Sequence, residues 1–185
     1  MDRRVRLITI LATMAALLAC IGCSDASISS GSRGGAAADY PNHDTRESLV
    51  ASADAVVIGE VLRTEVRDIN VSLEVDRTRN PQMAPYLVST VRVDRVIKGA
   101  LSSGDVIEVK ELFEGDGSAA RLKTSGLRGA LFLQSYAYDI PYSLVNPAES
   151  VLTIENGVSQ PSPNDKLFKS QKEADLVSEL QGLVE

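Results

Sequence analysis

The chain has 185 residues, of which 44% are hydrophobic and 24% are charged. This length accommodates one domain with a real hydrophobic core and is short for two. The formal net charge of −6 argues against a nucleic-acid partner, because binding to a phosphate backbone relies on neutralisation by Lys and Arg. An acidic chain also gains no attraction to anionic lipid head groups.

The N-terminal residues have the pattern of an export signal. Arg3, Arg4 and Arg6 precede an uncharged, largely apolar run that extends from Leu7 to Cys23. This run is shorter than the roughly 20 apolar residues of a membrane-spanning helix, and it ends in small residues as signal peptides do. We therefore predict a signal peptide over 1–19, with an uncleaved N-terminal anchor helix as the alternative.

The end of this leader, Leu17-Leu18-Ala19-Cys20, resembles the lipobox of bacterial lipoproteins. The resemblance implies a diacylglycerol thioether on Cys20 and cleavage directly before it, with Cys23 as the alternative site. Two or more acyl chains anchor a protein durably, whereas a single chain binds only marginally. The expected location is therefore the cell membrane, where the protein is lipid-anchored on the extracytoplasmic face. A redox role for Cys20 and Cys23 would need a thioredoxin-like context, and the pair lies inside the leader.

The segment after the leader is rich in Ser, Gly and Ala up to about Asn42. Such a composition buries too little apolar surface to offset the entropy of ordering the chain. We predict that residues 20–42 comprise the lipidated Cys and a flexible tether. The globular domain is then expected over 43–185.

A short helix is predicted at the start of the domain, because Asp44 and Glu47 have the spacing of a capping box. We expect this helix to reach about Ala53. Strands are predicted after it from continuous apolar runs and from the alternation of apolar and polar residues. They are expected at 55–62, 69–75, 87–97, 107–113, 129–134, and 151–154 with 157–158.

Glycines and prolines indicate how these strands are connected. Gly59 inside the first apolar run suggests a bend or a close approach of two backbones, and 55–75 is either one long curled strand or two strands. The polar residues from Arg77 to Pro85 predict a loop. Asn156-Gly157 is a strong signal for a β-hairpin.

The C-terminal residues predict an amphipathic helix. Ser170 and Glu173 repeat the capping-box spacing. The apolar residues on one helical face are Leu176, Val177, Leu180, Leu183 and Val184. This face is expected to dock on the sheet, and the alternative is a helix that binds a partner.

Five to six strands, a short N-terminal helix and a C-terminal amphipathic helix predict a mainly β fold, either a small OB-like barrel or a sandwich. The strand sequences at 53–61 (ADAVVIGEV), 91–99 (VRVDRVIKG) and 129–133 (GALFL) are similar to bacterial secreted proteins with an OB-like barrel. They are also similar to the netrin-like domain of metalloproteinase inhibitors. That family's disulfides are absent here, and the Cys amine with which it chelates zinc is missing from the domain, because Cys20 lies upstream. The resemblance therefore implies a fold and no chemistry.

No catalytic, cofactor-binding or metal-binding group is predicted. His43 is the single His, and its place at the end of the tether would put a general base on a flexible segment. No second His or Cys lies near it to complete a zinc site. The chain also has no glycine motif for phosphate or dinucleotide binding. We predict a non-enzymatic protein without cofactor or metal.

The densest group of acidic residues is Glu111, Glu114 and Asp116, beside Gly115 and Gly117. Carboxylates on a Gly-rich loop bind Ca²⁺ in some proteins, but the spacing of an EF-hand is absent. We therefore interpret this loop as a solvated turn. Two of these carboxylates facing each other in a cleft would instead indicate a hydrolase.

Tyr136, Tyr138 and Tyr142 gather around Pro141 and form a possible binding surface for a saccharide or a peptide. The alternative is that these rings pack at the end of the sheet. The predicted function is a membrane-anchored extracytoplasmic lipoprotein of binding or interaction type. Its expected partner is an envelope protein or a saccharide. A protease-inhibitor-like module and a carboxylate-based hydrolase are the alternatives.

Overall fold

The computed structural model describes residues 40–72, 81–113, 115, 117, 119–163 and 165–184. All of them belong to one compact unit, Ala38–Glu185. The predicted signal peptide and nearly all of the predicted tether, including Cys20 and Cys23, lie outside the described residues. Within the described ranges, neither helix has the length and apolar character needed to cross a bilayer.

The described part of the chain is mainly β, as predicted, with eight strands and two helices. The helices are α2 (Arg46–Ser52) and α3 (Glu173–Gly182). The strands are β1 (Ala55–Asn70), β2 (Met83–Lys98), β3 (Val106–Leu112), β4 (Arg128–Gln134), β5 (Tyr142–Leu144), β6 (Val151–Glu155), β7 (Val158–Gln160) and β8 (Gln171–Lys172). The sequence predicted five to six strands. Strands β5 and β8 were not predicted, because they are too short to show a periodic pattern, whereas β7 was predicted as the second arm of the hairpin at Asn156-Gly157.

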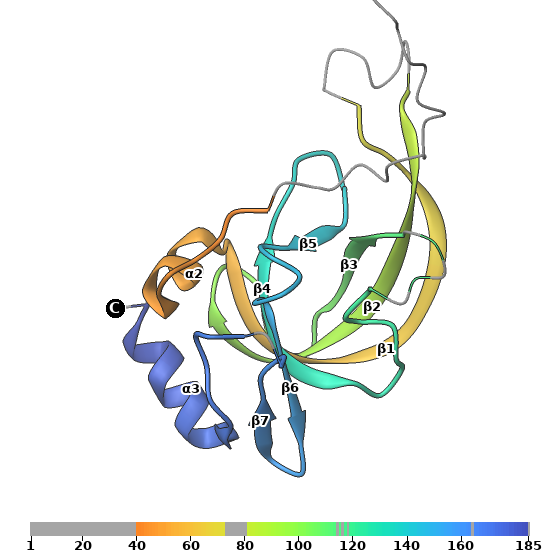
Figure 1. Ribbon diagram of the computed structural model, residues 1–185. Coiled ribbons are helices and arrows are strands. Elements are labelled where there is room, and N and C mark those ends of the chain that lie inside the picture. The colour runs from red at the N-terminus through yellow and green to blue at the C-terminus, as the bar shows by residue number, and fades with distance from the viewer. Residues whose placement is uncertain are drawn as a thin grey trace, which may run out of the picture. The chain divides into compact units, whose positions relative to one another are not determined.

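The strands are hydrogen-bonded in the order β1-β2-β3-β5-β4-β6-β7-β8, and β1 also pairs with β4. All pairings are antiparallel except that between β3 and β5, which is parallel. Five strands therefore form a closed cycle of pairings, β1-β2-β3-β5-β4-β1. Strands β6, β7 and β8 continue from β4, and Figure 1 shows β1 curving around this cycle.

Strand β1 is one long curled strand rather than two. Its pairing with β2 shifts register between Ile58 and Gly59. A Cβ atom added to Gly59 would lie 2.8 Å from the Arg92 carbonyl oxygen, and one added to Gly129 would lie 2.7 Å from the Leu152 carbonyl oxygen. Gly59 and Gly129 are paired opposite each other. The close backbone approach predicted at Gly59 is confirmed.

Two strand boundaries differ from the prediction. Strand β1 ends at Asn70, so only the first two residues of the expected strand at 69–75 are in β structure, and 73–75 lie outside the described residues. Strand β2 begins at Met83, inside the predicted loop 77–85. The reason is that β1 continues through its polar residues and pairs with β2 as far as Asn70 opposite Met83.

The hydrophobic core consists of two clusters on opposite faces of β1 and β4. The first cluster, here called the helix-side core, joins Val56 and Phe132 to Leu49 of α2 and Leu176 of α3. The second, here called the ring core, takes residues from all five strands of the cycle: Val57, Val91, Val109, Leu131 and Leu144. Both faces of β4 and of the first half of β1 (55–61) are thus buried, which explains their continuous apolar runs.

Helix α2 is capped one residue later than predicted. The side chain of Thr45, not that of Asp44, accepts a hydrogen bond from the Ser48 amide at 3.1 Å. The buried residues of the helix are Leu49 and Val50, as predicted. The side chain of Lys98 in turn donates to the Val50 carbonyl oxygen at 2.8 Å and so ties α2 to the end of β2.

Helix α3 docks on the sheet, as predicted, through Leu176, Val177 and Leu180, and Leu183 packs against the same core while partly buried. Val184, also expected on this face, is instead 40% exposed, because the helix ends at Gly182. The capping box expected from Ser170 is wrong, because Lys172 is the N-cap residue and makes no side-chain capping bond. The two residues before the helix instead pair with β7 as β8. Figure 1 shows α2 and α3 side by side, and an ion pair between Arg46 and Glu179 links them.

Candidate ligand-binding face

Lys110 is a buried cation on the face of β3 opposite the ring core. Its neighbour Val109 packs in that core, so the alternation of β3 turns Lys110 the other way. Lys110 is nevertheless only 7% exposed. Its Nζ atom donates to the Pro141 carbonyl oxygen at 3.1 Å and lies 3.6 Å from the centre of the Tyr136 ring and 6.0 Å from that of Tyr86.

The charge of Lys110 has no carboxylate to balance it within the described ranges. None of the ion pairs found there involves Lys110, and the nearby Glu108 is held by Arg67 at 2.5 Å. The ammonium is stabilised by one carbonyl oxygen and by aromatic faces, which attract cations. Burial lowers the pKa of Lys110 to about 8, and burial also raises the pKa of Tyr86.

The loop between β4 and β5 covers Lys110. Tyr136 and Tyr138 of this loop are 45% and 53% exposed. The Tyr136 hydroxyl lies 2.8 Å from Ser143 Oγ, and Ser143 of β5 pairs with Lys110. Tyr138 has a φ of 65°, in the left-handed region that non-Gly residues seldom adopt. We call Lys110, Tyr86, Tyr136 and Tyr138 the tyrosine–lysine face.

The structure divides the three tyrosines that the sequence singled out. Tyr136 and Tyr138 are exposed on the loop, whereas Tyr142 on β5 packs against the ring core. Lys110 and Tyr86 were not predicted as members of the site. Lys110 follows Val106 and Glu108 on its face of β3, and both of these are more exposed, so the sequence pattern alone suggests another solvated side chain.

Glu111 is as deeply buried as Lys110 but has a full set of partners. It is 5% exposed. Its Oε1 accepts from the Arg121 amide at 2.7 Å, and its Oε2 accepts from the Leu122 amide at 2.8 Å. Burial raises the pKa of Glu111, and the two amide hydrogen bonds oppose this rise. Glu111 therefore fixes the segment that places Leu122 in the ring core, while Glu114 and Asp116 lie outside the described residues.

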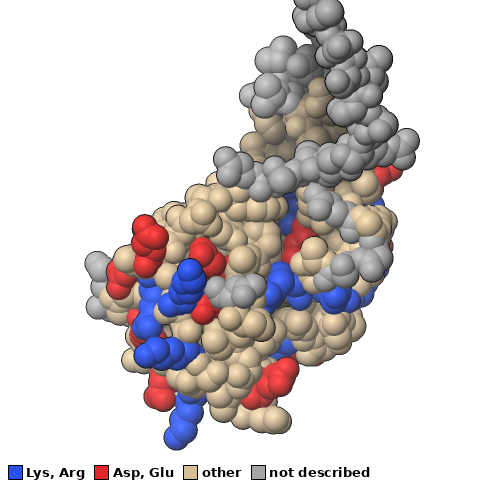
Figure 2. All heavy atoms as spheres, viewed as in Figure 1, with Lys and Arg blue, Asp and Glu red and all other residues tan. Residues whose placement is uncertain are grey.

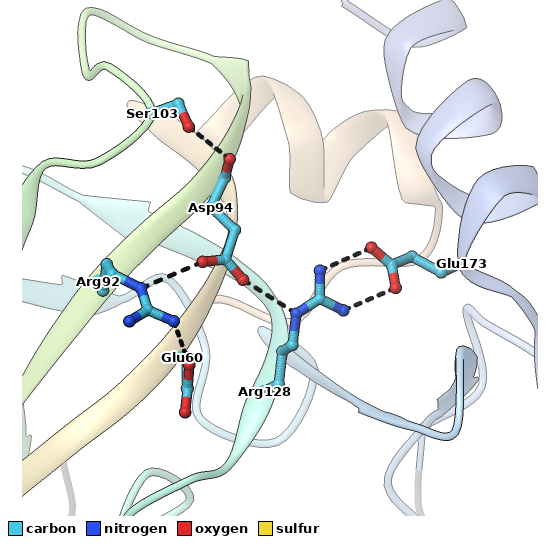
Figure 3. A network of polar contacts seen from close by, with 6 residues as sticks. All are labelled: Glu60, Arg92, Asp94, Ser103, Arg128 and Glu173. Atoms are coloured by element: carbon cyan, nitrogen blue, oxygen red, sulfur yellow. Dashed lines mark hydrogen bonds and ion pairs between the residues drawn. The ribbon is translucent and has the colours of Figure 1, made fainter.

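A chain of ion pairs links β1, β2, β4 and α3 (Figure 3). Arg128 of β4 binds Glu173 of α3 through two bonds of 2.6 and 2.8 Å and Asp94 of β2 at 2.9 Å. Arg92 joins Asp94 to Glu60 of β1. These contacts raise the pKa of Arg128 and lower that of Glu173. Because each charge faces an opposite one, we interpret the chain as structural.

His43 belongs to the folded domain and not to a flexible tether end. It is 9% exposed, and its Nδ1 lies 3.4 Å from Ser48 Oγ of α2. The expectation that His43 is mobile is wrong, because a hydrogen bond fixes the segment before α2 to the domain. The Asn146 side-chain amide donates to the Pro41 carbonyl oxygen at 3.0 Å.

The described residues contain no group of three or more His, Cys, Asp or Glu side chains able to hold a metal ion. Comparisons with family models, with curated proteins and with solved structures find no match to this chain.

Proposed function

We propose that this chain is a membrane-anchored extracytoplasmic lipoprotein whose domain is an OB-like barrel that binds a saccharide. The observation that carries the binding role is the tyrosine–lysine face, where the Tyr136 ring closes over a buried ammonium and the same loop carries the exposed Tyr138. A buried cation without a carboxylate partner is costly to fold. Such a cost at a surface with exposed aromatic rings favours a functional role over a structural one.

The pairing pattern supports the OB-like barrel. Strands β1, β2, β3, β5 and β4 close on each other, and all five contribute to the ring core. Barrels of this kind bind oligonucleotides and oligosaccharides on the face of strands 2 and 3, between the loops 1–2 and 4–5. The tyrosine–lysine face lies on the corresponding elements, with Tyr86 on β2, Lys110 on β3 and Tyr136 on the β4–β5 loop.

Charge decides between the two ligand classes of such a face. The net charge of −6 disfavours a phosphate backbone. The molecular face seen in Figure 2 shows acidic and basic side chains interspersed rather than a basic strip. A saccharide needs no large positive field, and its C–H faces and hydroxyl groups match aromatic rings with a few polar groups.

The binding role is tested with a panel of neutral and acidic envelope oligosaccharides and the purified full-length protein in detergent. We expect Tyr138→Ala and Tyr136→Ala to weaken binding about tenfold each, or roughly 1.4 kcal/mol. Tyr142→Phe, in the core, is the matched control and leaves the affinity unchanged. Absence of saccharide binding, together with capture of an envelope protein that depends on Tyr138, would replace the saccharide by a protein partner.

The anchor is tested by metabolic labelling with a palmitate analogue. The wild type is expected to incorporate the label and Cys20→Ser to lose it. Cys23→Ser is the control and keeps the label. If Cys23→Ser loses the label and Cys20→Ser keeps it, the lipidation site is Cys23. If both variants keep the label, the lipoprotein assignment is contradicted.

A further inference from the structure

A pocket of ≈ 490 Å³ lies where the segments 42–44, 148–149 and 166–167 meet, and it shares no residue with the tyrosine–lysine face. This volume is within the range of sites for small molecules. Among its charged lining residues, Asp44 and Glu149 are acidic and Lys166 is basic. Its walls therefore carry more acidic than basic side chains, and this balance favours a positively charged ligand.

The walls of this pocket are tied together by hydrogen bonds. Asn146, in the turn that leads to Glu149, donates to the Pro41 carbonyl oxygen at 3.0 Å. Arg46 of α2 donates to the Leu167 carbonyl oxygen at 2.6 Å. Both bonds join residues that are far apart in the sequence, so the pocket is a product of the fold rather than of one loop.

Two buried acceptor atoms of residues that line this pocket have no hydrogen-bond partner in the part of the chain that the structure describes. The Ser48 hydroxyl donates its one proton to the Thr45 carbonyl oxygen at 2.9 Å. The contact between Ser48 Oγ and His43 Nδ1 must then have the nitrogen as donor, which in the neutral ring leaves a lone pair on Nε2. His43 Nε2 and Glu149 Oε2 are both buried, and neither has a hydrogen-bond partner among the described residues.

Unpaired buried acceptors are costly, and each needs a donor. We infer that the pocket binds a small organic cation that carries N–H donors, an amine or a guanidinium, with His43 Nε2 and Glu149 Oε2 as acceptors. Both atoms are shielded from solvent, so binding requires a lining side chain to move, and we assign this movement to Lys166, which lines the pocket and is exposed. A metal ion fits less well, because no three His, Cys, Asp or Glu side chains among the described residues, Asp44 included, are arranged to hold one.

The single His makes the test specific, because the imidazole NMR signals of the full-length protein come from His43 alone. Putrescine and methylguanidine serve as free ligands, and a short lysine-rich peptide represents a protein source of the same group. We expect a saturable shift of the Nε2 signal with at least one of these probes. A response to the free ligands assigns a small-molecule site, and a response to the peptide alone assigns a protein partner.

Glu149→Gln keeps the shape of the side chain and removes its charge, and we expect it to weaken binding about tenfold. Glu155→Gln, an exposed carboxylate on β6 that does not line this pocket, is the matched control and binds as the wild type does. His43→Gln, followed by calorimetry and by circular dichroism, is expected to stay folded and to lose binding. No saturable shift below about 10 mM of any probe, or a shift with Zn²⁺ alone, overturns the inference.

Discussion

Lys110 and Glu111 are neighbours on β3, and both are almost fully buried, at 7% and 5% exposure. Glu111 has an amide donor on each oxygen, whereas Lys110 has one carbonyl oxygen and the faces of two tyrosines. A buried charge with a full set of hydrogen bonds stabilises the structure around it. A buried charge with incomplete partners weakens the fold and is tolerated where it serves a function.

The largest loss of stability is expected from replacing Glu111. Glu111→Ala leaves the Arg121 and Leu122 amides without acceptors, and we expect the free energy of unfolding to fall by about 2–4 kcal/mol. Urea denaturation followed by circular dichroism measures this loss. Glu108→Ala on the same strand removes only a partly exposed ion pair and is expected to cost under about 1 kcal/mol. Equal losses in the two variants would show that Glu111 does not hold the segment at Leu122.

Burial of the Lys110 ammonium is expected to lower the free energy of unfolding, whereas the hydrogen-bonded Glu111 carboxylate raises it. The size of the Lys110 effect depends on pH. The pKa of Lys110 falls from 10.5 to about 8 on folding, so between these values the unfolded chain binds more protons than the folded one. The stability that Lys110 contributes therefore rises with pH above about 8, and it is lost as the pH falls through that value. Relative to Lys110→Met, the wild type should gain stability between pH 7 and pH 9.5, by at most about 1.4 kcal/mol per pH unit.

Urea denaturation of both proteins across this pH range gives the difference directly, because the other titrating groups are common to both. Lys172→Met on β8 changes an exposed lysine and is the matched control, with a difference from the wild type that stays constant with pH. A constant difference for Lys110→Met as well would mean that the Lys110 ammonium is not penalised by burial.

The smallest effect on stability is expected at Tyr136, which is 45% exposed. Tyr136→Ala removes the ring above Nζ and admits water, so the pKa of Lys110 should rise toward its ordinary value. The free energy of unfolding should change by less than about 1 kcal/mol. The pH profile of Lys110 acylation by a small amine-reactive reagent, read by mass spectrometry, measures the pKa. An unchanged profile would mean that the Tyr136 ring does not shield the ammonium.

Local patterns in the sequence were enough to predict much of the sheet. The buried run of β1, the end of β2 to within one residue, the hairpin at Asn156-Gly157 and the docking of α3 through Leu176, Val177 and Leu180 were expected and are present. These features rest on the alternation of side chains, on turn chemistry and on helical periodicity. The cap of α2 was misplaced by one residue. The capping box predicted for α3 is absent, because the two residues before the helix pair with β7.

Only some residues of the candidate site could be predicted from the sequence. Tyr136 and Tyr138 were recognised as aromatic residues near Pro141, but Lys110 was not, because its partner Pro141 lies 31 positions away. The burial of His43 likewise depends on contacts that reach Asn146, 105 positions from Pro41. No pattern within a short window can register such contacts.

Sequence patterns alone predicted the buried strands and both helices, since these patterns depend on side chains within about ten residues of one another. They did not predict β5, β8 or the start of β2, which depend on strand pairing. The sequence also carries the leader pattern that predicts export and a lipid on Cys20. Tertiary packing sets the closed cycle of five strands and the place of His43 in a pocket wall. It also buries Lys110 with no carboxylate partner among the described residues, while Glu111 receives an amide donor on each oxygen. The reason is that the environment of a side chain is set by strands and loops brought together from distant parts of the chain.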